Sequence, residues 1–388
     1  MTKQPSYRFA EYTESWVEKK LGEIVERITR KNKNLESDLP LTISAQYGLI
    51  DQETFFNKKV ASKDVSGYYL LKKGEFAYNK SYSSDYPWGA VKRLDNYEMG
   101  VLSTLYIVFR PNSIDSDFLA VYYDSPKWYK EVSMRAAEGA RNHGLLNISP
   151  QDFFDTELIF PVNQSEQTAL GSFFQDTDQL ISLQQRKLEV LKEQKKTYLK
   201  LLFPAKGQTK PALRFAGFED DWKEVKLGEH CDIATGKLDA NAMVTDGEYD
   251  FYTSGIQKYK IDVAAFEGPA ITIAGNGATV GYMHYADGKF NAYQRTYVLS
   301  NFLVDRSFIY SEIGRKLPSK IQQEARTGNI PYIVMDMLTK LDICLPSLPE
   351  QEVIGSFFQD LDKAIAKQEE KVNQLKESKK TLLRKMFI

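Results

Sequence analysis

The chain of 388 residues carries 51 Lys and Arg against 52 Asp and Glu, and 42% of its residues are hydrophobic. This length suits two domains of ordinary size, and the near-neutral charge argues against a surface coated with nucleic-acid-binding residues, while leaving room for local basic patches. No apolar run approaches the roughly 18 residues that span a bilayer, and the polar N-terminus lacks a secretory signal, so we expect a cytoplasmic protein. Cys231 and Cys344 are the only cysteines in the sequence, and neither lies at a spacing typical of metal ligands. This argues against a disulfide framework or a structural zinc.

The first half of the chain opens with PSYRFAEYTESWVEKKLGE at Pro5. Strand-like patterns follow in GYYLLKKGEFAYNK and STLYIVFRP. A helix-like stretch covers residues 117–138, and after ARNHGLLNI comes an apolar strand, ELIFP. This mixture of strands and helices predicts an α+β domain.

The second half repeats the same order. It opens with PALRFAGFEDDWKEVKLGE at Pro211, and strands are predicted in GPAITIAGNG and FNAYQRTYVLSN. A helix-like stretch covers residues 307–325, and ARTGNI precedes the apolar strand DICLP. We therefore expect two like domains, joined by the linker FPAKGQTKPAL, which contains the Pro and Gly residues typical of a connection.

Each half ends in the same charged helix. Residues 166–204 align with residues 350–388 without a gap, with 20 identities in 39 positions. Apolar residues recur at steps of 7, 3, 7 and 4 and form a narrow stripe that fits one partner helix, for which we expect the other copy, packed antiparallel. The stripe consists of Ile181, Leu188, Leu191, Tyr198 and Leu202 in the first copy and Ile365, Val372, Leu375, Leu382 and Met386 in the second.

The length of these helices suggests a spacing role. At about 1.5 Å per residue, a helix of roughly 30 residues is about 45 Å long, enough to hold two domains about one DNA turn apart. In the alternative interpretation the helices only hold the domains together. The expected organisation is a first domain over 1–161, a first long helix region over 162–204, a linker over 205–212, a second domain over 213–346 and a second long helix region over 347–388.

Three motifs occur twice in the same order. Each half opens with RFA…W…KLGE, and each repeated helix contains GSFFQDxD. Between them, a segment that begins with Pro and ends with Glu-Gln precedes the GSFFQDxD motif, from Pro161 to Gln167 and from Pro349 to Gln351. With this layout the whole chain resembles the DNA-specificity subunit of type I restriction-modification systems. The resemblance implies an α+β fold with two pseudo-symmetric target-recognition domains of mixed strands and helices, separated by two long antiparallel coiled-coil-like helices. In that family each domain reads one half of a bipartite, asymmetric DNA target, and the helices set the spacer.

The resemblance also implies the partners of the chain. These are double-stranded DNA, two methyltransferase subunits that dock on the helices, and motor-nuclease subunits in the full complex, with no membrane. It implies a reader and scaffold that is not itself an enzyme and carries no cofactor.

The residues themselves offer little catalytic chemistry. The sequence has no Asn-Pro-Pro-aromatic motif of an amino-methylating enzyme and no Walker lysine. The glycine cluster AGNGATVGY, from Ala274 to Tyr282, precedes a strand-like stretch and not a helix, so we expect a tight turn or a close backbone approach to DNA. The histidines His143, His230 and His284 lie apart from other ligand residues, and we expect no metal site.

Two other functions stay open at this point. A protein–protein adaptor would use the repeated helices for assembly without reading DNA. An enzyme acting alone would bind S-adenosylmethionine or a nucleotide as the purified chain.

DNA reading needs Lys, Arg, Ser and Tyr for phosphates and Arg, Lys, Asn or Gln for base edges. In the first domain such residues gather in YNKSYSSDYPWGAVKR and ARNHG, for which a solvated loop is the alternative. The predicted DNA-binding residues there are Asn79, Lys80, Ser81, Tyr82, Lys92, Arg93, Arg141, Asn142 and His143.

The second domain offers weaker candidates in SGIQKYKID, NAYQRTY and EARTGN. They are Gln257, Lys258, Lys260, Gln294, Arg295 and Arg326. Arg141 and Arg326 hold matching places in the two halves, which indicates either a shared role at the DNA or a shared cap on the carbonyls of the preceding helix.

The repeated helices carry two further sets of candidates. Phe173, Phe174, Phe357 and Phe358 of the GSFFQD motifs are predicted to dock the methyltransferase subunits, with buried staples between helix and domain as the alternative. The lysine-rich stretches KEQKK at 192–196 and ESKK at 377–380 either contact the DNA spacer or form a solvated helix face, which is the usual role of a charged run.

Overall fold

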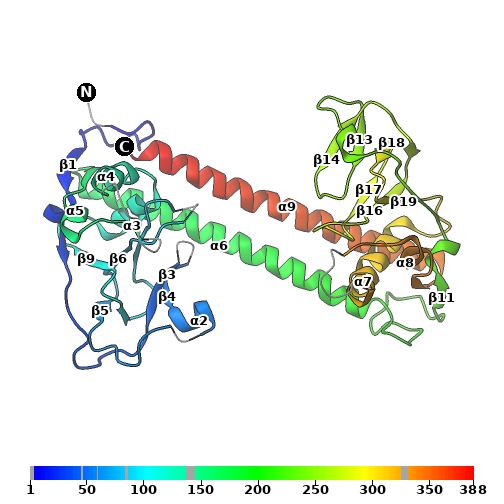
Figure 1. Ribbon diagram of the computed structural model, residues 1–388, viewed down its shortest axis with the longest axis horizontal. Coiled ribbons are helices and arrows are strands. Elements are labelled where there is room, and N and C mark those ends of the chain that lie inside the picture. The colour runs from blue at the N-terminus through cyan, green and yellow to red at the C-terminus, as the bar shows by residue number, and fades with distance from the viewer. Residues whose placement is uncertain (1–3, 45–46, 59, 84–85, 137–144, 325–330) are drawn as a thin grey trace. The chain divides into compact units, whose positions relative to one another are not determined.

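The structure, a computed structural model, describes residues 4–44, 47–58, 60–83, 86–136, 145–324 and 331–388. The chain divides into two compact units (Figure 1): unit 1 comprises Met1–Gln184 and Lys371–Ile388, and unit 2 comprises Gln185–Glu370. Both units are α+β, which confirms the fold class expected from the sequence. In the described part of the chain, every helix is too short or too polar to cross a membrane.

Unit 1 mixes short strands with short helices before the first long helix. Its elements are β1 (Val17–Lys20), α1 (Leu21–Ile24), β2 (Val25–Arg27), β3 (Leu41–Ser44), β4 (Gly48–Asp51), α2 (Gln52–Phe56), β5 (Tyr69–Lys72), β6 (Phe76–Asn79), β7 (Ala90–Arg93), β8 (Met99–Leu102), β9 (Ile107–Pro111), α3 (Ser116–Asp124), α4 (Tyr129–Arg135), α5 (Pro150–Phe154), β10 (Glu157–Phe160) and α6 (Gln164–Leu201), whose second half lies in unit 2.

Unit 2 repeats the strand-then-helix order. Its elements are β11 (Lys223–Lys226), β12 (Asp232–Thr235), β13 (Tyr249–Tyr252), β14 (Lys258–Ile261), β15 (Phe266–Glu267), β16 (Ala270–Ala274), β17 (Met283–Ala286), β18 (Lys289–Ala292), β19 (Thr296–Ser300), α7 (Arg306–Glu324), α8 (Met335–Thr339), β20 (Asp342–Leu345) and α9 (Leu348–Met386), whose last part lies in unit 1.

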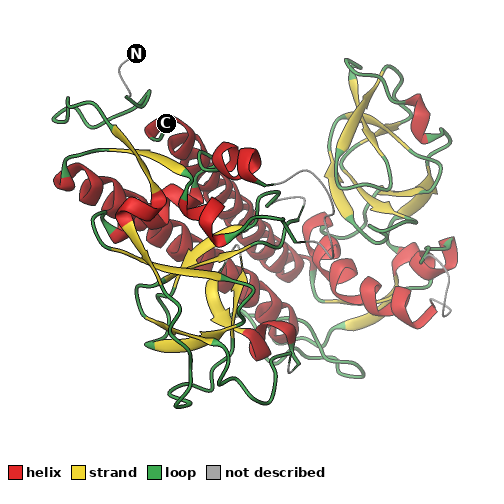
Figure 2. Ribbon diagram, turned by 60° about the vertical axis from the view of Figure 1, so that its left-hand side comes forward, coloured by secondary structure: helices red, strands yellow, loops and turns green. Residues whose placement is uncertain are grey.

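Each unit contains a four-stranded antiparallel sheet of the same order, visible among the yellow strands of Figure 2: β2-β9-β6-β7 in unit 1 and β12-β19-β16-β17 in unit 2. The third strand of each is almost entirely buried, because it lies between two neighbours in its sheet and under the helices. Unit 1 adds the pairs β3-β4 and β5-β8, whereas unit 2 adds a second sheet, β14-β13-β18-β15. The halves thus share a central sheet and differ in what is attached to it.

A buried ion pair closes each unit at the start of its long helix. In unit 1, Arg8 Nε and Nη2 donate to Glu166 Oε1 and Oε2 at 2.6 and 2.7 Å, and Trp16 Nε1 donates to Oε1 at 3.2 Å. In unit 2, Arg214 pairs with Glu350 in the same bidentate way, at 2.7 Å for both bonds. These contacts explain why RFA and the Glu-Gln lead recur in both halves.

The glutamine that follows each of these glutamates positions the next helix. Gln167 Oε1 accepts from the backbone N–H of Asp115, and Gln351 Oε1 accepts from that of Asp305. Asp115 in turn caps α3 by accepting from the backbone N–H groups of residues 117 and 118, and Asp305 accepts from the N–H of Phe308 in the first turn of α7.

Within each unit the long-helix segments run antiparallel. In unit 1, Asp178 of α6 pairs with Lys379 of α9 at 2.6 Å. In unit 2, Lys195 of α6 pairs with Asp362 of α9 at 2.5 Å, and Tyr198 packs on the ring of Phe357. The pairing of the two repeated helices is confirmed.

Each long helix ends with a phenylalanine in an aromatic cluster. Phe387, after α9, lies in unit 1 with ring centroids 5.5 to 6.4 Å from those of Trp16, Phe118 and Phe174. Phe203, after α6, occupies the equivalent place in unit 2, with centroids 5.2 to 5.8 Å from those of Trp222, Phe308 and Phe358. The repeated helix therefore supplies the last side chain of each core.

Two sequence-based expectations need correction. The helix expected over residues 117–138 is two helices, α3 and α4, because Pro126 has no backbone N–H and disfavours a helical conformation at Ser125, whose ψ is 158°. The long helices have 38 and 39 residues instead of roughly 30. The helix over 307–325 is confirmed as α7, and the linker region 203–213 contains no helix or strand.

Candidate nucleic-acid interface

The first predicted DNA-binding stretch follows β6 in unit 1. Asn79 Oδ1 accepts from the backbone N–H of Ser81 at 3.0 Å, so the asparagine shapes the turn that leaves the strand. Lys80 Nζ lies 3.5 Å from the carbonyl of Ile148, and Tyr82 packs at the edge of the core. Ser81 is exposed. The stretch thus presents a short polar turn at the end of a buried strand.

Lys92 and Arg93, on β7, make ion pairs within unit 1. Lys92 Nζ lies 2.6 Å from Asp124 Oδ1. Arg93 donates to Asp95 at 2.6 Å, to Asp117 at 2.7 Å and to the hydroxyl of Ser116 at 2.9 Å. These contacts hold β7 against α3, so both side chains stabilise the fold of unit 1. Their role at DNA stays a prediction.

The second predicted stretch spreads over two places in unit 2. Lys258 and Lys260 lie on β14 and both approach Asp250 of the neighbouring strand, at 3.8 and 2.9 Å. Gln257 precedes this strand and is exposed. Gln294 Nε2 lies 3.4 Å from Asp239, and Arg295 is exposed beside it.

Four predicted residues, Arg141, Asn142, His143 and Arg326, lie outside the described residues.

A polar cluster that the sequence did not single out joins two loops of unit 2. Ser254 Oγ donates to Asn276 Oδ1 at 2.5 Å, and Thr279 Oγ1 donates to the carbonyl of Ser254. His284 Nε2 lies 3.4 Å from the carbonyl of Gly255, and burial lowers the pKa of this histidine below its usual value. The two loops belong to SGIQKYKID and AGNGATVGY, which the sequence singled out separately, but nothing in the sequence indicated the contact between them.

The GSFFQD phenylalanines divide into two pairs. Phe174 and Phe358 have no exposed surface and lie in the two cores. Phe173 and Phe357 are half-buried and pack on Phe9 in unit 1 and on Tyr198 in unit 2. A partner subunit therefore cannot reach Phe174 or Phe358 without opening a core.

The predicted stripe residues lie on the packed side of the helices. Four of them are buried, namely Leu188, Leu202, Val372 and Met386, and six are half-buried, namely Ile181, Leu191, Tyr198, Ile365, Leu375 and Leu382. Leu383, which the pattern omitted, is also buried.

The lysine-rich ends of the helices are partly neutralised. In unit 2, Lys192 pairs with Glu369 at 2.5 Å and Lys196 with Glu193 at 3.4 Å. A shallow hollow of about 440 Å³ is lined by five basic side chains, namely Lys192, Lys195, Lys196, Lys200 and Arg315. In unit 1, Lys379 pairs with Asp178 and lies 3.6 Å from Asp124. Several of these lysines therefore stabilise the helix pair, which leaves their role at a DNA spacer a prediction.

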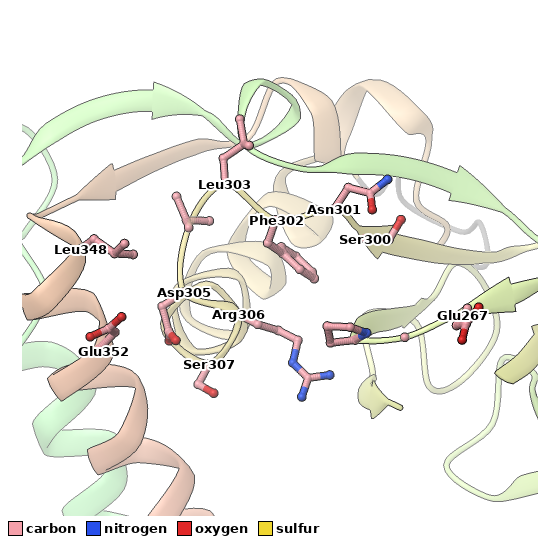
Figure 3. A pocket seen from close by; sticks show the side chains of 13 residues that line it. Glu267, Ser300, Asn301, Phe302, Leu303, Asp305, Arg306, Ser307, Leu348 and Glu352 are labelled. Atoms are coloured by element: carbon pink, nitrogen blue, oxygen red, sulfur yellow. The ribbon is translucent and has the colours of Figure 1, made fainter. Parts of the chain in front are cut away.

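A larger hollow of unit 2 has a different character (Figure 3). It measures about 780 Å³ and lies between the first turn of α7, the loop that precedes it and the first turns of α9. Three carboxylates, of Glu267, Asp305 and Glu352, line it together with one cation, Arg306, which is paired with Asp287. The exposed side chains of Leu303 and Leu348 lie at its edge. Acidic and apolar lining repels phosphate and suits a protein partner.

In the described part of the chain, no group of three or more His, Cys, Asp or Glu side chains could hold a metal ion.

Comparison with known proteins points to one family. Residues 219–377 match the family model of the type I restriction modification DNA specificity domain. Over 135 residues the chain is 42% identical to the type I restriction enzyme EcoDI specificity subunit of Escherichia coli, a match that covers 35% of this chain and 30% of that protein. Over 328 residues it is 23% identical to the type I restriction enzyme MjaVIII specificity subunit of Methanocaldococcus jannaschii, covering 73% of this chain and 72% of that protein.

Solved structures share the fold over almost the whole chain. The S subunit of a type I restriction-modification system from M. genitalium is similar with a TM-score of 0.66 and 16% identity, covering 99% of both chains. A chain from a structure of complex assembly and conformational transition in a type I restriction-modification system is similar with a TM-score of 0.55 and 18% identity, covering 96% of this chain and 97% of that one. Residues 219–377 thus match the type I restriction modification DNA specificity domain, and the whole chain shares the fold of a solved type I S subunit.

Proposed function

We propose that the chain is the non-catalytic DNA-reading subunit of a type I restriction-modification complex, in which each unit reads one half of a bipartite, asymmetric target. The observation that supports this most is a repeated frame with unlike surface segments. Both units contain the same sheet order, the same Arg–Glu pair and the same aromatic cluster. The segments that leave the central strands differ: KSYS follows β6 in unit 1 and GNGA follows β16 in unit 2. Unlike segments on like frames are what two unlike half-targets require.

The long helices are proposed to set the distance between the two half-targets. Their 38 and 39 residues correspond to about 57 and 59 Å at 1.5 Å per residue. Residues 1–161 and 213–346 act as the two target-recognition domains in this proposal, with 162–204 and 347–388 as the spacer regions and 205–212 as the linker.

The proposed partners are double-stranded DNA, two methyltransferase subunits and, in the full complex, motor-nuclease subunits. The acidic and apolar hollow beside α9 is a candidate docking surface for a methyltransferase subunit in unit 2. Its exposed Leu303 and Leu348 supply the apolar contact area that protein interfaces use, and its carboxylates disfavour DNA there.

The test is co-expression of the chain with a methyltransferase subunit in a host that lacks adenine methylation, followed by long-read mapping of methylated adenines. We expect one bipartite motif with a fixed gap. Absence of new methylation, with a stable complex and an active methyltransferase, would contradict the proposal and favour the adaptor function. Binding of the complex to duplex DNA separates the two independently, because phosphate neutralisation makes affinity fall steeply with salt and an adaptor shows no such dependence.

A further inference from the structure

The central sheets of the two units give a residue-by-residue correspondence that the sequence did not. β6 lies between β9 and β7, and β16 lies between β19 and β17. Phe76 is opposite Phe109 in unit 1, and Ile271 is opposite Leu299 in unit 2, so these two pairs hold equivalent places. The correspondence can then be followed to the point where each strand ends.

The backbone contacts beyond the strand ends are also the same. In unit 1, the carbonyl of Lys80 accepts from the N–H of Leu146 at 2.9 Å, and Ser81 forms a bridge with Leu145. In unit 2, the carbonyl of Gly275 accepts from the N–H of Ile333 at 2.7 Å, and Asn276 forms a bridge with Tyr332.

Lys80 therefore corresponds to Gly275, and Ser81 corresponds to Asn276. The counterpart of the predicted DNA-binding stretch of unit 1 is the start of the glycine loop, Gly275–Tyr282, and not the stretch Gln257–Lys260 that the sequence suggested.

The glycine loop is held in one conformation by the polar cluster described above. Ser254 binds the side-chain oxygen of Asn276, and Thr279 binds the carbonyl of Ser254. The ring of Tyr282 packs edge-on against that of His284, with centroids 4.8 Å apart. Since a recognition element loses affinity when it must be ordered on binding, such bracing favours a preformed contact surface.

The loop also leaves suitable groups free. With its oxygen bound by Ser254, Asn276 keeps its Nδ2 group, which donates no hydrogen bond to any residue that the structure describes. Gly277 has a φ of +83°, and no atom lies within 4 Å of the place where a Cβ would stand, so the backbone is open to close approach. Lys258 and Lys260, in contrast, share Asp250.

We propose that the Gly275–Tyr282 loop is the element of unit 2 that reads duplex DNA, with Asn276 as a specificity-determining residue. Its amide N–H groups meet an acceptor on a base edge, and the open backbone at Gly277 allows the loop to come close enough. Arg295, whose carbonyl accepts from the N–H of Gly275 at 2.9 Å, lies next to the loop and is exposed, so it is placed to contact the phosphates beside it. The inference rests on the proposed function of the chain.

The experiment uses the co-expressed complex and maps methylated adenines for the wild-type chain and four variants. We expect Asn276→Ala to relax one half of the motif by about tenfold or more at one base pair, and to leave the other half and the gap unchanged. Ser81→Ala, at the position of unit 1 that corresponds to Asn276, is expected to affect only the other half. Lys260→Ala tests the competing stretch Gln257–Lys260, and the assignment of the loop predicts that neither half changes in this variant.

The possible results distinguish a failure of the proposed function from a failure of the loop assignment. A wild-type complex without any bipartite motif contradicts the proposed function itself. A wild-type motif that stays the same in Asn276→Ala overturns only the assignment of the loop, and a change in Lys260→Ala would then assign the role to the stretch Gln257–Lys260. Asn276→Gln guards against a folding defect, because it keeps the amide and moves it by one methylene; unchanged specificity in this variant also overturns the assignment.

Discussion

Trp16 and Trp222 hold equivalent places in the two units, but only one of them finds a hydrogen-bond partner. Trp16 Nε1 donates to Glu166, whereas Trp222 Nε1 is buried and has no partner among the described residues. A buried donor without a partner costs stability, so the two indoles contribute differently although their apolar surroundings are alike.

The difference predicts unequal effects of one substitution. Trp16→Phe removes a donor from a buried carboxylate, whereas Trp222→Phe removes an unpaired N–H. We expect Trp16→Phe to destabilise its unit by about 0.5 to 1.5 kcal/mol more than Trp222→Phe destabilises the other. Hydrogen exchange of core amides measures each unit separately. Equal losses would show that the indole N–H of Trp16 contributes nothing net.

Cys231 allows a second test at this scale. Burial raises the pKa of its thiol from 9.0 to about 12. Between these values the unfolded chain loses the thiol proton and the folded chain keeps it, so the free energy of unfolding falls as the pH rises through that window. At pH 8 we expect iodoacetamide to modify Cys231 only after unfolding, which mass spectrometry of the labelled peptide detects. Rapid labelling of the native chain would contradict its buried position.

At the scale of elements, the repeated and strongly periodic segments were the ones that sequence could predict. The stripe from Ile181 to Leu202 predicted a paired helix, and alternating apolar residues predicted β16 and β19 correctly. The break between α3 and α4 was missed because the periodic pattern of the stretch is helical, whereas the single residue Pro126 interrupts the helix.

The braced loop of unit 2 could not be predicted from the sequence for a different reason. Ser254, Asn276 and His284 come from three segments, and only the fold brings them together. The correspondence between Lys80 and Gly275 was also hidden, because the strands before them contain unlike residues and the match depends on backbone pairing.

The GSFFQD motif gives a test of helix packing. A Cβ on Gly171 would lie 2.7 Å from Asp117 Cβ, and one on Gly355 would lie 2.3 Å from Asp305 Oδ1. Although Ala favours a helix by about 1 kcal/mol over Gly, we expect Gly171→Ala and Gly355→Ala to destabilise by about 1 to 3 kcal/mol, because the neighbouring helix must move. Thermal unfolding followed by circular dichroism measures the change.

Gly314 is the matched control for these glycines. It lies on the exposed face of α7, and a Cβ there would meet only the flexible end of Met283, at 3.1 Å. Gly314→Ala is therefore expected to be neutral or slightly stabilising. If it lowers the melting temperature as much as Gly171→Ala does, close packing is not the reason for the glycine in the motif.

At the scale of the whole molecule, the proposed spacer role predicts that helix length sets the gap in the DNA target. Seven residues inserted between Gln184 and Gln185, and seven between Glu370 and Lys371, keep the apolar stripe on the same face. Each insertion adds about 10.5 Å, so we expect the gap to widen by about three base pairs, with both half-motifs unchanged. Methylated-adenine mapping gives the gap directly.

An insertion in one helix alone serves as the control for this prediction. It shifts the stripe of one helix against the other, and we expect loss of the paired helices and of methylation. A gap that stays the same in the double insertion would leave the helices as an assembly device without a metric role.

The end of α9 belongs to unit 1 although it is the last segment of the chain, and this has a consequence for biosynthesis. Unit 2 is one continuous stretch, Gln185–Glu370, whereas unit 1 needs Lys371–Ile388, which the ribosome adds only after all of unit 2. Until Phe387 is made, the cluster of Trp16, Phe118 and Phe174 lacks its fourth ring. The unit translated first is thus the one completed last, and a nascent chain that stalls before residue 371 leaves an apolar site open to chaperones.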